Sequence, residues 1–291
     1  MSLSNDIVTL LSAMTEASSL FIAAAGLTLV FGAMRIINIA HGSFYMYGAF
    51  LLSAVAGATG GGRFWLALLL APLIVAAIGS TVEVTVLRRV YAKEHLVQLV
   101  VTYALFLILA DLALKFWGSA PRSVSVPSAL SGSLTIGSGR FPVYDLFAIG
   151  MAIAVGVVMW ALLQRSALGW RIRAAVEDPE TLATSGTNVP LLSTTVFTIG
   201  ALLAGLAGAI AGPLQSISPG LDASIIVSAF IVAVIGGLGS VVGAAIGAVV
   251  ISLFDTAGVL WAPKWSSAFI YLAMIAVLAL RPWGLLGTPE R

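Results

Sequence analysis

Long apolar runs separated by short polar loops make up most of the chain. A membrane-spanning helix needs about 20 apolar residues, because the hydrocarbon core is roughly 30 Å thick and a helix rises about 1.5 Å per residue. Runs of this kind are predicted at residues 7–35, 43–58, 64–87, 97–117, 143–164 and 267–280. Residues 181–221 and 223–254 contain no ionisable side chain, and Gly/Pro breaks at 212–213, 219–220 and 236–237 divide them further. We therefore expect about nine apolar segments, within a range of about eight to ten.

These segments are predicted to be helices. In lipid every backbone polar group must be bonded internally, and the runs lack the alternating pattern of a barrel strand. Composition agrees, because 60% of the 291 residues are hydrophobic and only 9% are charged, against about a quarter charged in a water-soluble domain. The predicted fold class is an all-α polytopic membrane protein, in which transmembrane and re-entrant helices form a single domain over residues 1–291.

Basic side chains fall in three short clusters that predict the orientation. Lys and Arg in short loops mark the cytoplasmic side of a membrane. The clusters are Arg88, Arg89 and Lys93; Arg165, Arg171 and Arg173; and Arg281 with Arg291. All three are cytoplasmic if the chain turns at 237–240, which places the N-terminus outside. The loop at about 118–142, rich in Ser, Gly and Pro, is then external, and the loop at about 165–189 is cytoplasmic.

Few residues could carry a reaction. The sequence contains no G-x-x-x-x-G-K-[ST], G-x-S-x-G or H-E-x-x-H motif, so neither ATP hydrolysis nor these nucleophilic and zinc chemistries are predicted. The two histidines, His41 and His95, lie in different segments, and there is no cysteine, so we expect no metal or other cofactor. The net charge of +2 is not gathered on a basic face, which argues against a nucleic-acid partner.

A non-enzymatic transport chain driven by another subunit fits this inventory best. A proton pump usually carries a relay of buried ionisable groups, and only Glu16, Arg35 and His41 are candidates for such depth. The alternative is a self-sufficient secondary transporter or channel for a small solute.

Polar residues interrupt the apolar pattern at 26–48. Arg35, Asn38 and His41 stand in what would otherwise be a continuous apolar helix, and an unbonded polar group in hydrocarbon costs several kcal/mol. One interpretation is a discontinuous helix that lines a substrate pathway. The other is an ordinary interfacial loop, in which Arg35 and His41 meet water.

A second interruption, GPLQSISPGLD, occupies residues 212–222. Two Gly/Pro-broken segments in separate halves of a chain indicate a transporter binding site, whereas a plain external turn would use the same residues. Small residues also recur at every fourth position, at Gly200, Ala204, Gly208 and Gly212 and at Gly239, Gly243 and Gly247. This spacing predicts close helix packing within the chain in preference to a seam between subunits.

The most polar internal segment covers residues 169–188. Asp178 is suited to cap a helix, Pro179 to occupy its first position and Gly186 to end it, so a short helix is predicted at 179–185. On a chain without a cytoplasmic domain, such a helix is either a docking element for a partner or a simple connection.

Taken together, these motifs resemble the permease subunit of branched-chain amino acid ABC importers, the LivH type. GLTLVFG at 26–32 and INIAHG at 37–42 are similar to the amino-terminal signature of that family, and residues 169–189 look like its cytoplasmic coupling loop. AFIVAVIGGLGSVVGAAIG at 229–247 and RPWGLLG at 281–287 look like its carboxy-terminal signatures. The resemblance covers essentially the whole chain.

The resemblance implies an ABC-importer permease in a bacterial inner membrane. The implied partners are a homologous, LivM-like second permease, two cytoplasmic ATP-binding subunits and an external or periplasmic substrate-binding protein. The implied cargo is a branched-chain amino acid or a related small polar or amino-acid-like solute. Residues expected on the substrate pathway are Asn38, His41, Gly42, Ser43, Gln215 and Ser218. Residues expected to contact the ATPase are Arg171, Arg173, Glu177, Asp178, Pro179, Glu180, Leu182 and Gly186.

Overall fold

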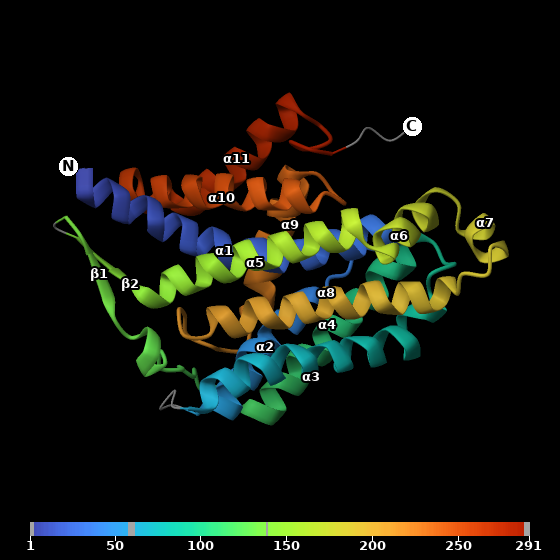
Figure 1. Cartoon of the computed structure of the whole chain (residues 1–291), viewed down its shortest axis with the longest axis horizontal. Helices are drawn as coiled ribbons and strands as arrows, with labels where there is room; N and C mark the ends of the chain where they lie inside the picture. The colour runs from blue at the N-terminus through green and yellow to red at the C-terminus, as the bar shows by residue number, and fades with distance from the viewer. Residues whose placement is uncertain (1–2, 58–61, 138, 288–291) are drawn as a thin grey trace.

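The chain folds into a bundle of helices of unequal length (Figure 1). The computed structural model describes residues 3–57, 62–137 and 139–287. Within these residues, six helices are long and apolar enough to cross a membrane: α1 (Leu3–Met34), α3 (Arg63–Thr85), α4 (His95–Trp117), α5 (Val143–Arg165), α8 (Val189–Ala211) and α10 (Val241–Trp261). Three shorter helices are α2 (His41–Ala56), α9 (Leu221–Gly236) and α11 (Ser266–Leu280). The all-helical polytopic prediction is confirmed, and the described residues contain the nine apolar segments that were expected.

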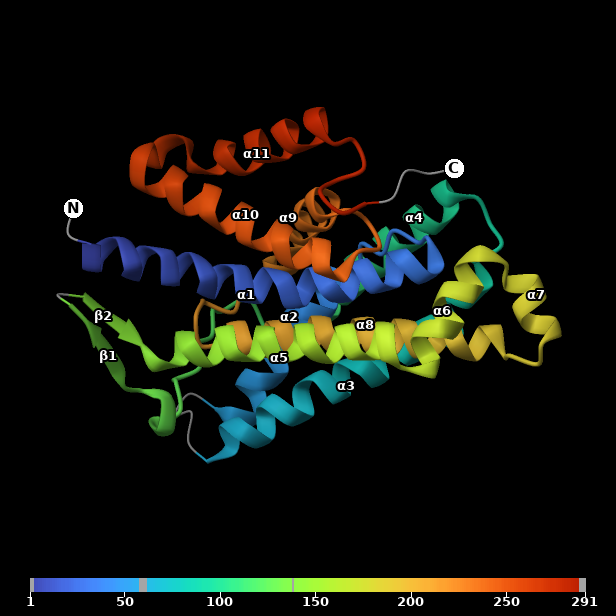
Figure 2. The ribbon, with the colours of Figure 1, turned by 45° about the horizontal axis from the view of Figure 1, so that its top comes forward.

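The two ends of the bundle differ. At one end lies a hairpin of β1 (Ser133–Ile136) and β2 (Gly139–Pro142), paired antiparallel with Ser133 opposite Pro142. At the opposite end, α6 (Ala167–Glu177) and α7 (Pro179–Thr184) project from the bundle (Figures 1 and 2). We call these the hairpin end and the basic end. The hairpin was not predicted, because Ser, Gly and Pro in the segment 118–142 indicate turns more strongly than strands.

The basic clusters gather at one end of the molecule. Arg173 on α6, His95 at the start of α4 and Trp283 after α11 line a single cavity there, and η1 (Leu87–Arg89), with Arg88 and Arg89, leads into α4. Arg291 lies outside the described residues. The chain turns between α9 and α10 at residues 237–240, as expected.

Helix α2 begins beside the middle of α1. The Nε2 of His41, the first residue of α2, donates a hydrogen bond to the backbone oxygen of Ala23, at 3.0 Å. Ala23 lies well inside α1, so residues 35–40 must run back along α1 before α2 starts. From there α2 continues toward the hairpin end, where α3 begins (Figure 1). At the first interruption the chain therefore turns back as a non-helical segment, residues 35–40, followed by helix α2.

Helix α9 also begins inside the bundle. It appears nearly end-on in Figure 2, while α1, α5 and α8 run across the view, so α9 crosses them steeply. The tail after α11 caps the C-terminal end of α9, because Leu285 and Leu286 donate backbone hydrogen bonds to the Ile235 and Gly236 oxygens, at 2.8 and 3.0 Å. The last carbonyl groups of a helix have no hydrogen-bond donor within the helix, and the RPWGLLG segment supplies donors for two of them.

Glycines allow α8 to lie close to its neighbours in the bundle centre. A Cβ atom on Gly200 would lie 3.2 Å from the Gly26 oxygen of α1, and one on Gly208 would collide with the Tyr45 oxygen of α2. Gly243 of α10 is packed equally closely against Gly236 of α9. The predicted packing within the chain is confirmed, because these small residues contact helices of the same molecule.

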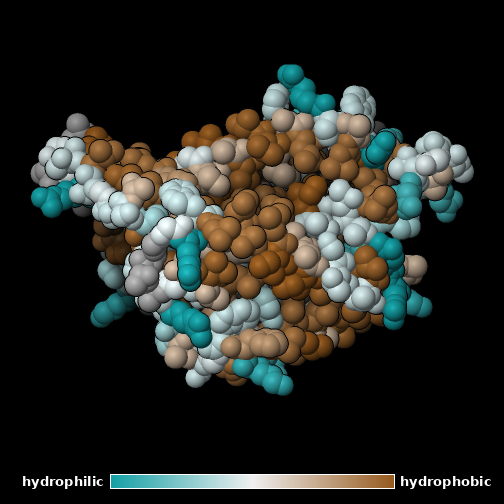
Figure 3. All heavy atoms as spheres, turned by 60° about the horizontal axis from the view of Figure 1, so that its bottom comes forward, coloured by the Kyte–Doolittle hydropathy of each residue, from teal (hydrophilic) through white to brown (hydrophobic). Residues whose placement is uncertain are grey.

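The outer surface of the bundle is apolar in its middle. Figure 3 shows hydrophobic side chains over most of the centre of one face, with most hydrophilic ones toward the two ends. Large exposed side chains such as Leu69 on α3, Ile108 on α4 and Ile153 on α5 contribute to this surface. An apolar band of this kind suits the hydrocarbon core of a bilayer.

Candidate translocation site

The two interruptions of the apolar pattern meet inside the bundle. Ser43, in the first turn of α2, donates a hydrogen bond through Oγ to Oδ2 of Asp222, in the first turn of α9, at 3.3 Å. Both side chains are buried, with exposed fractions of 0% and 1%. A Cβ atom on Gly42 would collide with the backbone oxygen of Asp222, so a glycine is needed for the two helix starts to approach this closely. We call residues 38–43 with Asp222 the crossing.

Several polar atoms at the crossing have no partner. Both side-chain atoms of the Asn38 amide and the Nδ1 of His41 are buried without a hydrogen bond to any described residue. The same holds for the hydroxyl of Thr28. An unsatisfied buried polar group costs about 1–3 kcal/mol, and native structures contain few of them. Such groups are retained where they serve another state or a ligand, so the crossing is the first place to look for a pathway.

The tautomer of His41 follows from its one hydrogen bond. A carbonyl oxygen only accepts, so Nε2 must carry the proton that it donates to Ala23. In neutral imidazole, Nδ1 is then an acceptor with its lone pair unused. The crossing therefore offers a free acceptor on His41 and both a free donor and a free acceptor on Asn38.

The remaining expected pathway residues lie on the hairpin side of the crossing. Gln215 donates from Nε2 to the hydroxyl of Tyr45, at 2.9 Å, and that hydroxyl also pairs with Ser19 of α1, at 3.3 Å. Ser218 is half-buried, and its backbone oxygen accepts from Leu221 at the start of α9. Four of the six expected residues thus lie in the crossing, whereas Gln215 is bonded to Tyr45, further along α2, and Ser218 lies shortly before α9.

A small cavity of about 380 Å³ opens beside Gln215. Its polar lining comes from Ser12, Thr15, Glu16, Ser19, Tyr45, Asp145 and Gln215, and its apolar lining from Leu20, Ala211, Leu214 and Ile225. Two of its lining side chains, Glu16 and Asp145, carry carboxyl groups, and none is basic. Its lining residues of α1 precede Ala23, which places it between the hairpin end and the crossing.

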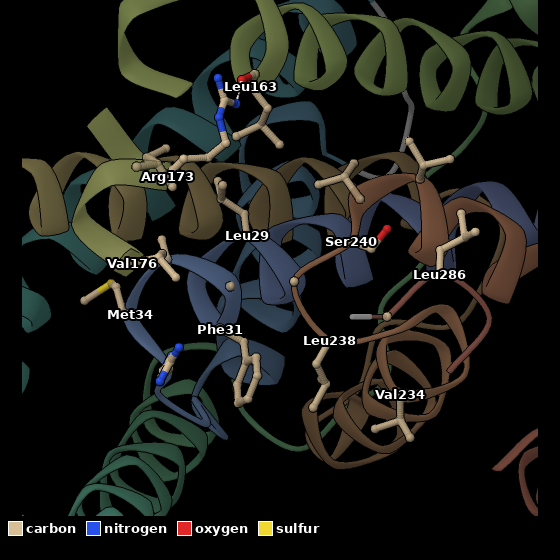
Figure 4. A pocket seen from close by; sticks show the side chains of 18 of the residues that line it. Leu29, Phe31, Met34, Leu163, Arg173, Val176, Val234, Leu238, Ser240 and Leu286 are labelled. Carbon is tan, nitrogen blue, oxygen red and sulfur yellow. Dashed lines mark hydrogen bonds between the residues drawn. The ribbon is translucent and has the colours of Figure 1, made fainter. Parts of the chain in front are cut away.

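A larger cavity of about 1180 Å³ opens toward the basic end. It is bounded by the end of α1, α5, α6, the turn between α9 and α10, and the C-terminal tail, and it reaches Ile37, directly before Asn38. Figure 4 shows Leu163 and Arg173 on one side of it, with Phe31, Leu238 and Val234 facing them. The crossing therefore lies between a small cavity and a large one along the length of the bundle.

Arg35 belongs to this larger cavity and not to the crossing. It is the first residue after α1, it is exposed, and its φ of 53° is the one positive value among described non-glycine residues. The first interruption thus contains an exposed residue at a helix end, Arg35, and two side chains buried within the bundle, Asn38 and His41.

The expected short helix is present at the basic end. α7 spans Pro179–Thr184, and Asp178 caps it by accepting from the backbone nitrogens of Glu180 and Thr181, each at 3.0 Å. These hydrogen bonds, with one from the Thr181 hydroxyl, lower the pKa of Asp178 below its usual value. Gly186 ends the helix with a φ of +87°, and α7 has no buried residue.

The segment before α7, expected only as a loop, forms the amphipathic helix α6. Its two arginines have different surroundings. Arg171 is exposed. Arg173 donates from Nη1 to the Leu163 oxygen of α5, at 2.5 Å, and its guanidinium lies 4.7 Å from the centre of the Trp170 ring. Of the other expected contact residues, Glu177, Pro179, Glu180 and Gly186 are exposed, and Leu182 is half-buried.

Known proteins resemble this chain along nearly its whole length. The sequence model of a family described as "Branched-chain amino acid transport system / permease component" matches residues 9–278. The chain belongs to this permease family. BraD of Pseudomonas aeruginosa, a high-affinity branched-chain amino acid permease, is 28% identical over 97% of this chain and 95% of its own. LivH of Escherichia coli K12 is 28% identical over 95% of this chain and 94% of its own. No solved structure matches.

Membership of this family shows what kind of protein the chain is. The chain is a multi-pass membrane permease component of an ABC import system, and it is not an enzyme. Such a system also contains ATPase and binding-protein components and a second permease. The fructose import permease FrcC of Rhizobium meliloti is 30% identical over 47% of this chain and 41% of its own, so permeases named for a different cargo share part of the sequence.

Sequence reasoning missed two acidic residues of this permease. Asp222 is the partner of Ser43 at the crossing, and it is the single ionisable residue between Glu180 and Asp255, which was the signal available. Glu83, near the end of α3, is fully buried and bonded to other segments of the chain. Nothing in the sequence indicates that burial, because Glu83 lies two residues before the end of α3.

Proposed function

We propose that this permease forms one half of an ATP-driven import pathway for branched-chain amino acids or closely related amino-acid-like solutes in a bacterial inner membrane. The hairpin end faces the outside and the basic end faces the cytoplasm, in agreement with the preference of Lys and Arg for cytoplasmic loops. The single observation that carries the proposal is the meeting of the two interruptions at Ser43 and Asp222, between two cavities.

The crossing acts as the closed gate of this pathway. Its buried amide and imidazole atoms lack partners in the closed arrangement, and opening would expose them to water or to the cargo. The acceptor Nδ1 of His41 suits an ammonium group, while the amide of Asn38 can bond to an ammonium group or a carboxylate. This set matches a zwitterionic amino acid better than an anion. Gly42, Ser43, Gln215 and Ser218 support the path on either side of these two residues.

The basic end is the coupling surface. α7, with Arg171, Glu177 and Asp178 before it, is exposed and stabilised by its own caps, as a segment that fits a partner's groove should be. Pro179, Glu180, Leu182 and Gly186 would contact an ATP-binding subunit, whereas Arg173 would hold α6 against α5. ATP can favour one arrangement of the pathway only by the difference in affinity of the ATPases for the two arrangements.

The implied assembly has a LivM-like second permease, two ATP-binding subunits and an external or periplasmic substrate-binding protein. Support comes from the names of relatives such as BraD and LivH, which are permeases of branched-chain amino acid transport systems. The binding protein would select the cargo, and the path would bind it weakly.

The test is leucine uptake by the complete complex in proteoliposomes with ATP and the binding protein. Asn38→Leu and His41→Leu should each reduce uptake about tenfold or more, because they remove the free polar atoms of the gate. The control is Thr81→Val on the exposed face of α3, where the hydroxyl bonds only to its own helix. Unchanged uptake in both gate variants would refute the assignment of the gate. Gradient-driven uptake by this chain alone, without ATP, would instead support a secondary transporter.

A further inference from the structure

A series of part-buried hydrogen bonds connects the start of α8 with the first interruption, through residues to which the proposed function assigns no role. The starting point is Glu83 near the end of α3, which is fully buried. Arg88 of η1 donates to both of its carboxylate oxygens, at 3.4 and 3.3 Å, in the one ion pair among the described residues. Thr194 of α8 donates to Oε2 at 2.7 Å, and the Tyr91 hydroxyl donates to Oε1 at 2.8 Å. The carboxylate thus joins α3, η1, the following loop and α8.

The loop that contains Tyr91 is bonded in turn to α4. Gln98, in the first turn of α4 and 6% exposed, donates through Nε2 to the backbone oxygens of Tyr91 and Lys93, at 3.1 and 3.0 Å. One turn further along α4, the hydroxyl of the buried Thr102 shares its one proton between the backbone oxygens of Ile37, at 3.0 Å, and of Leu99 on its own helix, at 3.1 Å. Ile37 directly precedes Asn38 of the crossing.

The other end of this chain of contacts is next to the coupling helix. Only Ser185 to Asn188 separate α7 from α8, and Asn188 caps α8 by accepting from the Leu191 nitrogen at 3.0 Å. α7 has no buried residue of its own, so a force on α7 reaches the bundle through the helices that flank it. On one side, α6 is fastened to α5 by Arg173. On the other side is the start of α8, where Thr194 bonds to Glu83.

We infer that Thr194, Glu83, Tyr91, Gln98 and Thr102 form a relay that carries movement of α7 and α8 to the backbone at Ile37 and so to the gate. The inference rests on the proposed function, in which α7 receives the ATPase and the crossing is the gate. The relay residues are positioning residues for the gate, since none of them belongs to the crossing itself, although Tyr91 and Gln98 also line the larger cavity. Hydrogen bonds to the buried Glu83 carboxylate resist separation, because a broken bond leaves its charge less compensated in the interior.

The same two helices provide a matched control. About one turn before Glu83 in α3 and one turn after Thr194 in α8, Ser80 and Thr198 bond through their hydroxyl groups at 2.6 Å. This bond also joins α3 to α8, but it involves no charge and leads to neither Tyr91 nor α4. Loss of the Ser80 bond should leave coupling intact, whereas loss of a relay bond should not.

The experiment measures leucine imported per ATP hydrolysed by the reconstituted complex, with assembly checked by size-exclusion chromatography. Thr102→Val removes the bond to Ile37 and should lower this ratio about fivefold or more, while Thr102→Ser, which keeps the hydroxyl, should restore it. Ser80→Ala should retain the wild-type ratio. Tyr91→Phe removes one hydroxyl near the loop surface and should also lower the ratio. This second variant keeps the test valid if Thr102→Val fails to assemble.

A second readout separates coupling from simple destabilisation. The chain contains no cysteine, so a cysteine introduced by Ala40→Cys reports the accessibility of the crossing to a small thiol reagent. ATP should change its labelling rate in the otherwise unmodified chain and not in Thr102→Val or Tyr91→Phe. A wild-type ratio and an ATP-dependent labelling rate in both variants would overturn the relay while leaving the proposed function in place. No ATP-driven uptake by the unmodified complex would overturn both.

Discussion

The crossing at residues 38–43 and the coupling segment at 178–186 both place polar residues in a largely apolar chain, but they satisfy them differently. Asp178 bonds to Glu180 and Thr181, two and three positions away. Ser43 instead bonds to Asp222, 179 positions away, and the neighbouring side-chain amide of Asn38 bonds to nothing described. The coupling helix is therefore stable through local contacts, whereas the crossing depends on how the whole bundle is assembled.

This difference suits the two roles. A helix that is exposed and locally capped can be moved by a partner without unfolding, because its hydrogen bonds travel with it. A buried site with unpaired polar atoms has a cost of about 1–3 kcal/mol per group in the closed arrangement, which lowers the free energy needed to open it. The following variants distinguish local from long-range dependence.

The largest effect is expected from Gly42→Val. Its side chain would collide with the Asp222 backbone and the Ile226 side chain, so α2 and α9 could not meet, and ATP-driven leucine uptake should be lost. Gly150→Val on α5 is the control, because a Cβ there meets nothing within 4 Å. Uptake near the wild-type level in an assembled Gly42→Val complex would show that the contact is dispensable.

A smaller effect is expected from Asp222→Ala, which leaves the Ser43 hydroxyl buried without its acceptor. The permease should lose about 1–3 kcal/mol of stability, seen as a lower unfolding temperature of the purified protein in detergent. Asp222→Asn keeps an acceptor oxygen and should be milder. Equal unfolding temperatures for Asp222→Ala and the unmodified protein would contradict the importance of this long-range bond.

Asp178→Ala should affect the coupling helix alone. Hydrogen exchange at Glu180 and Thr181 should become several-fold faster, because their amide groups lose the capping acceptor, while the unfolding temperature of the bundle stays the same. Asp178→Asn, a good cap, is the control. A global loss of stability in Asp178→Ala would contradict the local character of α7.

The cap should also depend on pH in a defined direction. Hydrogen bonds hold the pKa of Asp178 below its usual 3.8, so the folded helix favours the charged carboxylate. Its stabilising effect is complete above pH 3.8 and is lost only as the pH falls through the lower folded value. Protection of the two amides, corrected for intrinsic exchange, should therefore remain constant from about pH 7 to pH 5.

The smallest effect is expected from Arg171→Ala. This exposed side chain should contribute at most about fivefold to ATPase binding, measured as the affinity of the ATP-binding subunit for the permease. Arg173→Ala should in addition lower the unfolding temperature, because it removes the bond to Leu163 and the contact with Trp170. Identical behaviour of the two variants would contradict the different roles that we assign to them.

Features that depend on neighbouring residues were predictable from the sequence. The apolar segments follow from run length, because a bilayer imposes one thickness on every crossing. The helix at α7 follows from Asp178, Pro179 and Gly186, whose preferences act within a few positions. The hairpin at 133–142 and helix α6 were not anticipated, because their patterns are weak beside the turn residues around them.

Contacts between distant segments were decided only by the tertiary structure. The sequence contains two interruptions and an isolated Asp222 but does not specify that α2 and α9 start against each other, and it gives no sign that Glu83 is buried among Arg88, Tyr91 and Thr194. Helix formation and membrane insertion depend on each segment's own residues. Which polar groups meet depends on how the helices pack, and that is a property of the assembled bundle as a whole.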